Sequence, residues 1–297
     1  MKLTKHIHSS KINAVRQTDS RLWGLIAILA VATSLTSCVK DKLYNTPHPD
    51  KATVVITTDW ADALDETDVP AAYHIGMDDG EAVKTQEATT VYPDLLIPGK
   101  HSVFAYNEPQ GMTISGTTAS VNLRTDGTLE PMPDYLFSAV KEFEAQADDT
   151  VHVSVPMVRR LCPITLNLTL TGENVSEIVG IEATLGGIVQ TVNLQSRTLG
   201  TENRSVMLNV QQTGAEVKLQ CRVPGISPNE KQQLTVTLTM ADGHMFTITS
   251  DLSEELADLN AEREIVLNCT VQAPQDGHFS GTITDWMDGG SHDIEAN

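Results

Sequence analysis

The stretch Cys162-Pro163-Ile164-Thr165-Leu166-Asn167-Leu168-Thr169-Leu170 alternates apolar and polar side chains with a period of two. Because successive side chains of a β-strand point to opposite faces, this pattern predicts a strand with one buried face. The same alternation returns in residues 217–223, 234–240 and 265–271, and Gly, Pro, Asn or Asp bounds each run. Short strands separated by such turns predict an antiparallel β-sandwich.

One segment of this half has a different period. Leu252, Leu256 and Leu259 follow one another at helical spacing, and Asp251 or Ser253 could cap the first turn. We therefore expect a short helix over residues 251–260, between two strands.

The N-terminal half alternates less regularly. Strands are predicted at residues 53–58, 101–106, 120–123 and 151–155. Residues 124–134 contain two prolines and a glycine, which a helix or a central strand does not tolerate, so this segment is expected to be a long surface loop.

A domain boundary is expected near residues 156–163, where two prolines flank the basic pair Arg159-Arg160. This divides the chain into an N-terminal β-sandwich over residues 38–157 and a C-terminal β-sandwich over residues 158–297. The predicted fold class is all-β, with two tandem sandwiches and a short helix in the second.

The first 37 residues read as a signal peptide. A basic flank precedes an apolar run at residues 22–35, which is too short to span a bilayer as a stable helix. The run ends in Leu35-Thr36-Ser37-Cys38, which resembles the bacterial lipobox. The resemblance implies cleavage between Ser37 and Cys38 and a diacylglycerol on the Cys38 thiol. Residues 39–42 (Val-Lys-Asp-Lys) resemble in part the surface-export tether of Bacteroides-type lipoproteins, which favours the outer surface of the outer membrane over its periplasmic face.

The chain is strongly acidic, with a formal net charge of −19 over 297 residues. Removing residues 1–37, which carry five basic residues and one acidic residue, leaves about −23. Such a field repels phosphate backbones and anionic headgroups, so we expect no nucleic-acid partner and no membrane binding by charge. The N-terminal lipid would hold the protein on the membrane.

The sequence shows no pattern of a catalytic site. The nine histidines share no metal-ligand spacing, and no nucleophile elbow, phosphate loop or calcium loop is present. Aromatic residues make up 4% of the chain, which leaves few platforms for stacking sugars. We therefore predict a protein that is not an enzyme and that needs no metal or cofactor.

Three cysteines, Cys162, Cys221 and Cys269, follow the predicted cleavage site besides Cys38. Each has the apolar parity of its predicted strand. They could form one disulfide with a spare thiol, or they could be three small buried apolar residues.

Several segments together resemble a known family. These are residues 57–60 (Thr-Thr-Asp-Trp), 156–161 (Pro-Met-Val-Arg-Arg-Leu), 234–243, 250–253 and 281–286 (Gly-Thr-Ile-Thr-Asp-Trp). They are similar to the FimB-type, fimbrillin-like fimbrial subunits of Bacteroides-type type V pili. The resemblance implies two transthyretin-like, Greek-key sandwiches, a place in or at the base of a surface fimbria, and other fimbrial subunits as partners.

Pilins of this family lose their first strand to a protease that cuts after arginine. This chain has no arginine between Arg21 and Arg124, which suits an accessory or anchor subunit that keeps its lipid and its first strand. Such a subunit could join a filament by β-strand exchange, donating a strand from its C-terminal end. The candidate donor strand consists of Thr282, Ile283, Thr284, Asp285 and Trp286. The alternative is an outer-membrane lipoprotein that binds a glycan or a host protein outside any filament.

Overall fold

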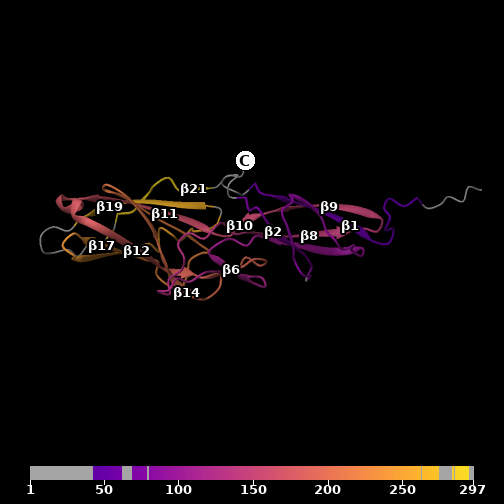
Figure 1. Cartoon of the computed structure of the whole chain (residues 1–297), viewed down its shortest axis with the longest axis horizontal. Coiled ribbons are helices and arrows are strands. Elements are labelled where there is room, and N and C mark those ends of the chain that lie inside the picture. Colours follow the sequence, from indigo (N-terminus) through magenta and orange to yellow (C-terminus); the bar gives the residue numbers. More distant parts are fainter. Residues whose placement is uncertain are drawn as a thin grey trace, which may run out of the picture. The chain divides into compact units, whose positions relative to one another are not determined.

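The computed structural model describes residues 43–61, 69–78, 80–261, 263–273, 283 and 285–293 (Figure 1). All described strands belong to one compact unit, His48–Asn297. Strands dominate this unit and build two sandwiches, so the predicted all-β fold class is confirmed. The cleavage and lipidation residues, Ser37 and Cys38, lie outside the described residues.

The first sandwich consists of a three-stranded and a five-stranded sheet. The smaller sheet has the order β4 (Thr89–Val91), β1 (Ala52–Asp59), β9 (Asp149–Pro156). The larger has the order β10 (Val158–Arg159), β8 (Phe137–Ala145), β5 (Gly99–Tyr106), β2 (Tyr73–Met77), β3 (Val83–Thr85). Their facing side chains, among them Ile56, Ile75 and Phe137, form one buried cluster.

The second sandwich follows the same plan on a larger scale. One sheet has the order β15 (Asn209–Thr213), β16 (Glu216–Val223), β11 (Cys162–Thr171), β19 (Arg263–Gln272). The other has the order β14 (Asn203–Met207), β12 (Ile178–Val189), β17 (Gln233–Met240), β18 (Met245–Asp251). The alternating side chains of β11 point into the core as predicted, and Ile164, Leu166 and Leu168 are at most 1% exposed. Burying each such side chain stabilises the fold by roughly 1.5–3 kcal/mol.

Each sandwich contains one parallel strand pair among its antiparallel ones. In the first, β1 pairs with β9, and in the second, β11 pairs with β19. The two pairs end alike, because Met157 N–H donates to Asp59 O at 2.8 Å and Ala273 N–H donates to Thr171 O at 2.6 Å. β9 therefore lies beside β1, and β19 beside β11, in matching register.

A small sheet connects segments from both halves of the sequence. It consists of β6 (Met112–Ser115), β7 (Thr118–Val121) and β13 (Thr191–Asn193). The loop at 124–134 that follows β7 is irregular, as predicted, but it does not lie wholly at the surface. Its Leu129 is fully buried and bridges to Val206 in the core of the second sandwich.

The predicted helix over residues 251–260 is wrong. Asp251 ends β18, and residues 253–258 form successive turns. Leu252 and Leu256 are buried, but the Ser253 hydroxyl accepts the main-chain N–H of Gln232 and donates to Asp251, which ties the first turn to the neighbouring strand. The described helical element is the single 3₁₀ turn η2 (Glu173–Glu177).

Candidate functional site

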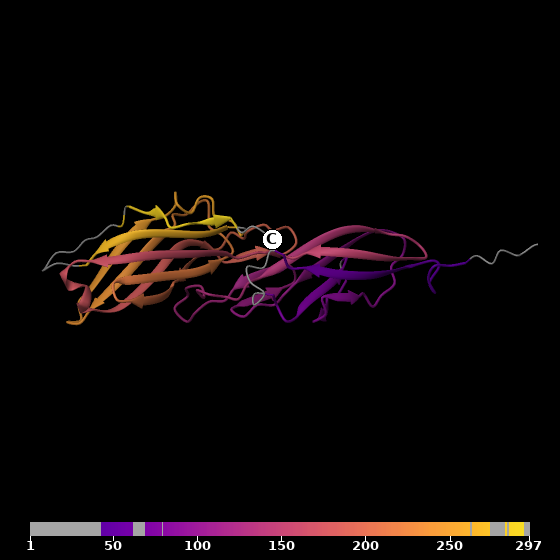
Figure 2. The ribbon, with the colours of Figure 1, turned by 90° about the horizontal axis from the view of Figure 1, so that it is seen from above.

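The C-terminal segment lies along an edge of the second sandwich (Figure 2). Two strands of two residues each, β20 (Met287–Asp288) and β21 (His292–Asp293), pair antiparallel with β19. We call residues 287–293 the tail. Because β19 would otherwise be the last strand of its sheet, the tail covers the main-chain groups of that edge.

A short bulge separates the two strands of the tail. Gly289 N–H donates to Val266 O at 2.7 Å, and Val266 N–H donates to the Ser291 hydroxyl at 3.0 Å. The Asp288 carboxylate accepts the N–H groups of Gly290 and Ser291 and holds the turn. Gly290 has a φ of 98°, which a residue with a Cβ rarely adopts. The Ser291 hydroxyl therefore takes the place of a main-chain carbonyl as the acceptor for the Val266 N–H.

The residues before the tail are fixed to the same sandwich. The Ser250 hydroxyl donates to Ile283 O at 2.5 Å and accepts the indole N–H of Trp286 at 2.9 Å. Ile283 is 5% exposed, and Trp286 packs against the second core. Of the candidate donor residues, Ile283, Asp285 and Trp286 lie outside strands, while Thr282 and Thr284 fall outside the described part of the chain.

Trp60 has a similar environment in the first sandwich. Its indole N–H donates to the Thr58 hydroxyl at 3.0 Å, and its ring meets Tyr73 and Phe137 edge-on at 5.6 and 5.4 Å. The two Asp-Trp pairs of the sequence thus each place an indole against the core of their own sandwich.

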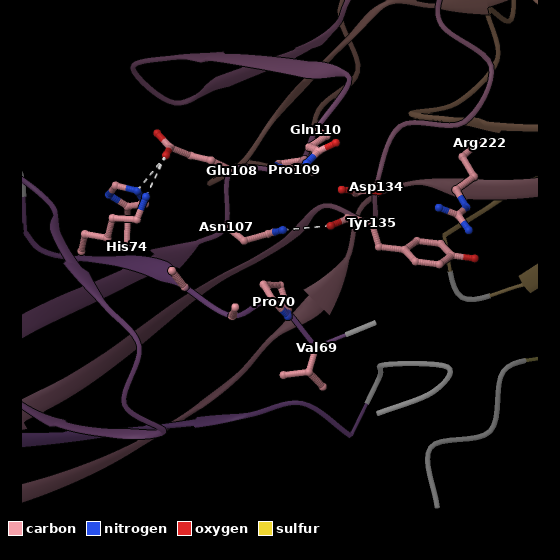
Figure 3. A pocket seen from close by; sticks show the side chains of 13 residues that line it. Val69, Pro70, His74, Asn107, Glu108, Pro109, Gln110, Asp134, Tyr135 and Arg222 are labelled. Atoms are coloured by element: carbon pink, nitrogen blue, oxygen red, sulfur yellow. Dashed lines mark hydrogen bonds and ion pairs between the residues drawn. The ribbon is translucent and has the colours of Figure 1, made fainter. Parts of the chain in front are cut away.

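A pocket of about 510 Å³ opens beside β2 and the loop after β5 (Figure 3). His74 stacks on Tyr106 at 5.0 Å, and its Nε2 lies 3.1 Å from Oε2 of Glu108 as an ion pair without hydrogen-bond alignment. The Asn107 amide donates to Tyr135 O and accepts Phe137 N–H. The Asn107 amide therefore ties the loop after β5 to the segment that leads into β8.

The Tyr135 ring beside this pocket is held by two arginines. The Arg222 guanidinium lies 4.0 Å from the ring centroid, and that of Arg159 lies 5.3 Å from it. Arg222 also donates to Pro133 O at 3.1 Å, and Arg159 donates to Ala261 O at 2.6 and 2.8 Å. The basic pair at the expected domain boundary is thus buried and structural, with Arg160 donating to Ser138 in the same way.

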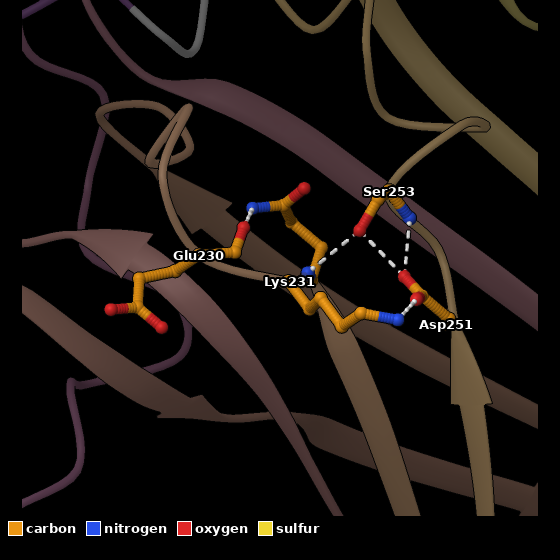
Figure 4. A network of polar contacts seen from close by, with 5 residues as sticks. Glu230, Lys231, Asp251 and Ser253 are labelled. Carbon is orange, nitrogen blue, oxygen red and sulfur yellow. Dashed lines mark hydrogen bonds and ion pairs between the residues drawn. The ribbon is translucent and has the colours of Figure 1, made fainter.

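A polar network joins the end of β18 to the loop before β17 (Figure 4). Asp251 accepts the Lys231 ammonium at 2.6 Å and both the hydroxyl and the N–H of Ser253. The hydrogen bond from Lys231, followed by those from Ser253, lowers the pKa of Asp251 to about 2. Asp251 is thus charged at neutral pH and anchors this turn.

No cluster of three or more His, Cys, Asp or Glu side chains in the described part of the chain could hold a metal ion. None of the helices within those residues is long and apolar enough to cross a bilayer.

Cys162, Cys221 and Cys269 are free and buried, so they are three small buried residues and not a disulfide with a spare thiol. Burial raises the pKa of Cys162 to about 12 and keeps its thiol protonated.

Residues 76–287 match the family model described as fimbrillin-A associated anchor proteins Mfa1 and Mfa2. The chain belongs to this family. The match spans most of both sandwiches, including β19 and the start of the tail. The resemblance predicted from the sequence is therefore confirmed, and the chain is a fimbrial structural protein and not an enzyme.

Solved structures share the fold at low sequence identity. The fimbrial anchor protein Mfa2 from Porphyromonas gingivalis is 12% identical with a TM-score of 0.50, over 74% of this chain and 90% of that one. A candidate adhesin from Bacteroides ovatus is 14% identical with a TM-score of 0.53, over 81% and 95%. A candidate polysaccharide-binding protein from Bacteroides thetaiotaomicron is 10% identical with a TM-score of 0.55, over 82% and 98%. Among curated protein sequences none matches.

Membership of the anchor family assigns the chain a fimbrial role at the cell surface, with fimbrial proteins as its partners.

Proposed function

We propose that the protein is a lipid-anchored accessory subunit that holds a fimbria at the outer membrane. The observation that carries this proposal is the match of residues 76–287 to the anchor family, in a chain whose residues 35–38 have the lipobox order. Acyl chains on Cys38 would supply the membrane affinity that this acidic protein lacks, since each buried methylene contributes roughly 0.8 kcal/mol.

We further propose that the subunit joins its neighbour by β-strand exchange, with its C-terminal end as the donor. Three features support this idea. The tail pairs with β19 through two strands of only two residues, Met287 is 64% exposed, and a terminal segment can leave its sheet without threading the chain through a loop. The first strand, β1, lies between β4 and β9, so a subunit that keeps β1 has no empty groove there for a neighbour's strand.

The anchor function is tested by replacing Cys38. Cys38→Ala should move the protein from the membrane fraction to an unprocessed or soluble form, and unchanged retention in the membrane would contradict the lipid anchor. Mass analysis of the protein from cells should show a lipidated N-terminus at Cys38. A dominant N-terminus after Lys51 or Lys84 would indicate a trimmed, polymerising subunit instead.

A second candidate function, glycan binding, has one observation in its favour. The outer face of the sheet of β11 and β19 carries a hollow of about 500 Å³ with amide and hydroxyl groups, among them Asn167, Gln211, Asn268 and Thr270. Amides and hydroxyls are suited to sugar hydroxyls, and the B. thetaiotaomicron protein described as a candidate polysaccharide binder shares the fold. A glycan array distinguishes the two functions. A glycan-binding protein should give a signal on the array, whereas an anchor should co-purify with fimbrial subunits without giving one.

A further inference from the structure

The parallel pairs β1–β9 and β11–β19 end with the same hydrogen-bond pattern, so β9 and β19 can be compared residue by residue. Asp59 pairs with Pro156 and accepts Met157 N–H, while Thr171 pairs with Gln272 and accepts Ala273 N–H. Pro156 therefore corresponds to Gln272. Counting back along both strands, His152 corresponds to Asn268 and Thr150 to Val266.

This register fixes which main-chain groups of β9 face outward. Because Met157 N–H points to β1, the period of two directs the N–H groups of Val155 and Val153 to β1 as well. The N–H and C=O groups of His152 and Ser154 then face away from β1. Thr150 has the same parity, and its N–H, which is not used by β1, bonds to its neighbour Asp149 Oδ1 at 2.8 Å.

In the described part of the chain, the corresponding edge is covered along residues 263–268 of the second sandwich and uncovered in the first. The tail pairs with Leu267 and Asn268, and the Ser291 hydroxyl accepts the Val266 N–H. In the first sandwich β9 is the last strand of its sheet, and within the described residues nothing pairs with the outward groups of His152 and Ser154. Among the described residues, the same position in the fold thus has an occupant in the second sandwich and none in the first.

The features with which edge strands usually avoid association are largely missing from β9. The strand pairs with β1 over eight consecutive residues without a bulge, and it contains no Lys or Arg. Its one proline, Pro156, is the last residue. The side chains of Thr150, His152 and Ser154, whose main-chain groups face outward, are exposed. This edge is therefore regular and accessible to an added strand.

We propose that the β9 edge is a docking site for an extended segment of another fimbrial subunit, which adds antiparallel to β9 and pairs with the main chain of His152 and Ser154. The antiparallel direction is that of the tail on β19. Val151 and Phe143 are half-buried at the border of the first core, so the incoming segment carries apolar side chains at alternate positions to cover them. The proposal rests on the proposed function for the identity of the partner.

Docking at this edge leaves β1 in its place. A subunit that keeps its first strand can therefore accept a neighbour's segment as well as donate its own, and no groove has to be emptied first. Each outward residue, His152 and Ser154, contributes one N–H donor and one C=O acceptor to the added strand.

The test is Ser154→Pro in the full chain, compared with Ser154→Ala. Proline removes the outward N–H and leaves the β1 ladder intact, because β1 receives its hydrogen bonds from the neighbouring residues. Each variant is purified from detergent-solubilised membranes of its own host, and the co-purifying fimbrial subunit is quantified by mass spectrometry. We expect about a tenfold loss for Ser154→Pro and wild-type yield for Ser154→Ala. Equal yields from the two variants, with both proteins folded by circular dichroism, would overturn the proposal.

A cross-linking experiment decides the question if the proline variant does not fold. A benzoylphenylalanine is placed at position 152, with position 212 on the edge strand β15 as the control. The proposal requires a cross-link from position 152 to a fimbrial subunit and none from position 212. A cross-link to a second copy of this chain, or none from position 152, would overturn it.

The two proposals fail in different ways. If wild-type protein brings down no fimbrial subunit, the proposed function fails. If the wild type brings one down and the Ser154→Pro variant does so equally, the function stands and the β9 edge is not the docking site.

Discussion

The indole N–H of Trp286 donates to the Ser250 hydroxyl across 36 residues of sequence, at 2.9 Å. The same hydroxyl donates to Ile283 O, so a single side chain holds two residues of the C-terminal segment against β18. The segment that precedes the tail is therefore part of the second sandwich, and only the tail beyond it is held by short ladders.

Ser250→Ala should lower the free energy of unfolding by about 1–3 kcal/mol, because it leaves both Trp286 N–H and Ile283 O without their partner. Urea denaturation followed by tryptophan fluorescence measures this change. Ser115→Ala, at an exposed position of β6, should alter stability by less than about 0.5 kcal/mol. Equal stabilities for the two variants would show that Ser250 does not hold the segment.

Gly290→Ala should loosen the tail from β19, because alanine is strained at a φ of 98°. Hydrogen exchange of the C-terminal peptide should become roughly five- to tenfold faster, since the Gly289 N–H bond to Val266 O opens more often. Gly214→Ala imposes a similar strain in the turn between β15 and β16 and serves as the control. Faster tail exchange in the control variant would contradict a local effect at Gly290.

His101 and Asp78 should make stability pH-dependent. Burial alone lowers the pKa of His101, but the hydrogen bond to Asp78 and the carbonyl of Ile97 outweigh it and raise that pKa above its ordinary value of 6.5. Both ring nitrogens face an oxygen at 2.8 Å, so the imidazolium is the form that satisfies them. A raised pKa means that this stabilisation is complete below pH 6.5 and is lost as the pH rises through the folded-state value.

Asp78 sets the acid limit of the pH range in which this pair stabilises the fold. Burial works against the shift, but hydrogen bonds from His101 and Ser102 lower its pKa below the ordinary value of 3.8, so its contribution is lost as the pH falls further. Urea midpoints measured from pH 5 to 8 should therefore decline above pH 6.5 in the wild type. His101→Gln should flatten this part of the profile, and an unchanged profile would exclude the pair as its source.

The three buried thiols should be unreactive in the folded protein. Burial raises the pKa of Cys162 and of Cys269 to about 12 and also raises that of Cys221, so almost no thiolate is present at pH 7.5. In a Cys38→Ser background, maleimide should label none of the three under native conditions and all three in denaturant. Ser115→Cys, at an exposed position, should be labelled at once. Fewer than three labels in denaturant without reductant would indicate a disulfide.

Four strands of the second sandwich, β11, β16, β17 and β19, could be predicted because their alternation is complete, whereas β12, β14, β15 and β18 were missed. Residues 234–240 fall within β17 and residues 265–271 within β19. The first sandwich was harder to predict, and β2, β3, β4, β8 and β10 were missed. In β8, Val140, Lys141 and Glu142 lie in succession at exposed positions, which breaks the period of two. The predicted helix failed because leucines at helical spacing can also be buried by turns.

The candidate site could be predicted only in part. The sequence pointed to the C-terminal end, but the strands there comprise Met287–Asp288 and His292–Asp293, after the Asp-Trp pair expected to close the last strand. This tail is polar, and its ladder depends on the Ser291 hydroxyl and on Gly290, which no period of two reveals. The open edge of β9 was not predictable either, because it depends on a parallel pairing between residues about a hundred positions apart.

Immunogold labelling of intact cells tests the anchor assignment most directly. Antibodies against the second sandwich should place gold at the base of fimbriae, and the signal should disappear from fimbriated cells that lack the gene. Gold distributed along the filaments would assign the protein to the shaft. Gold scattered over the cell surface without any relation to fimbriae would contradict the account.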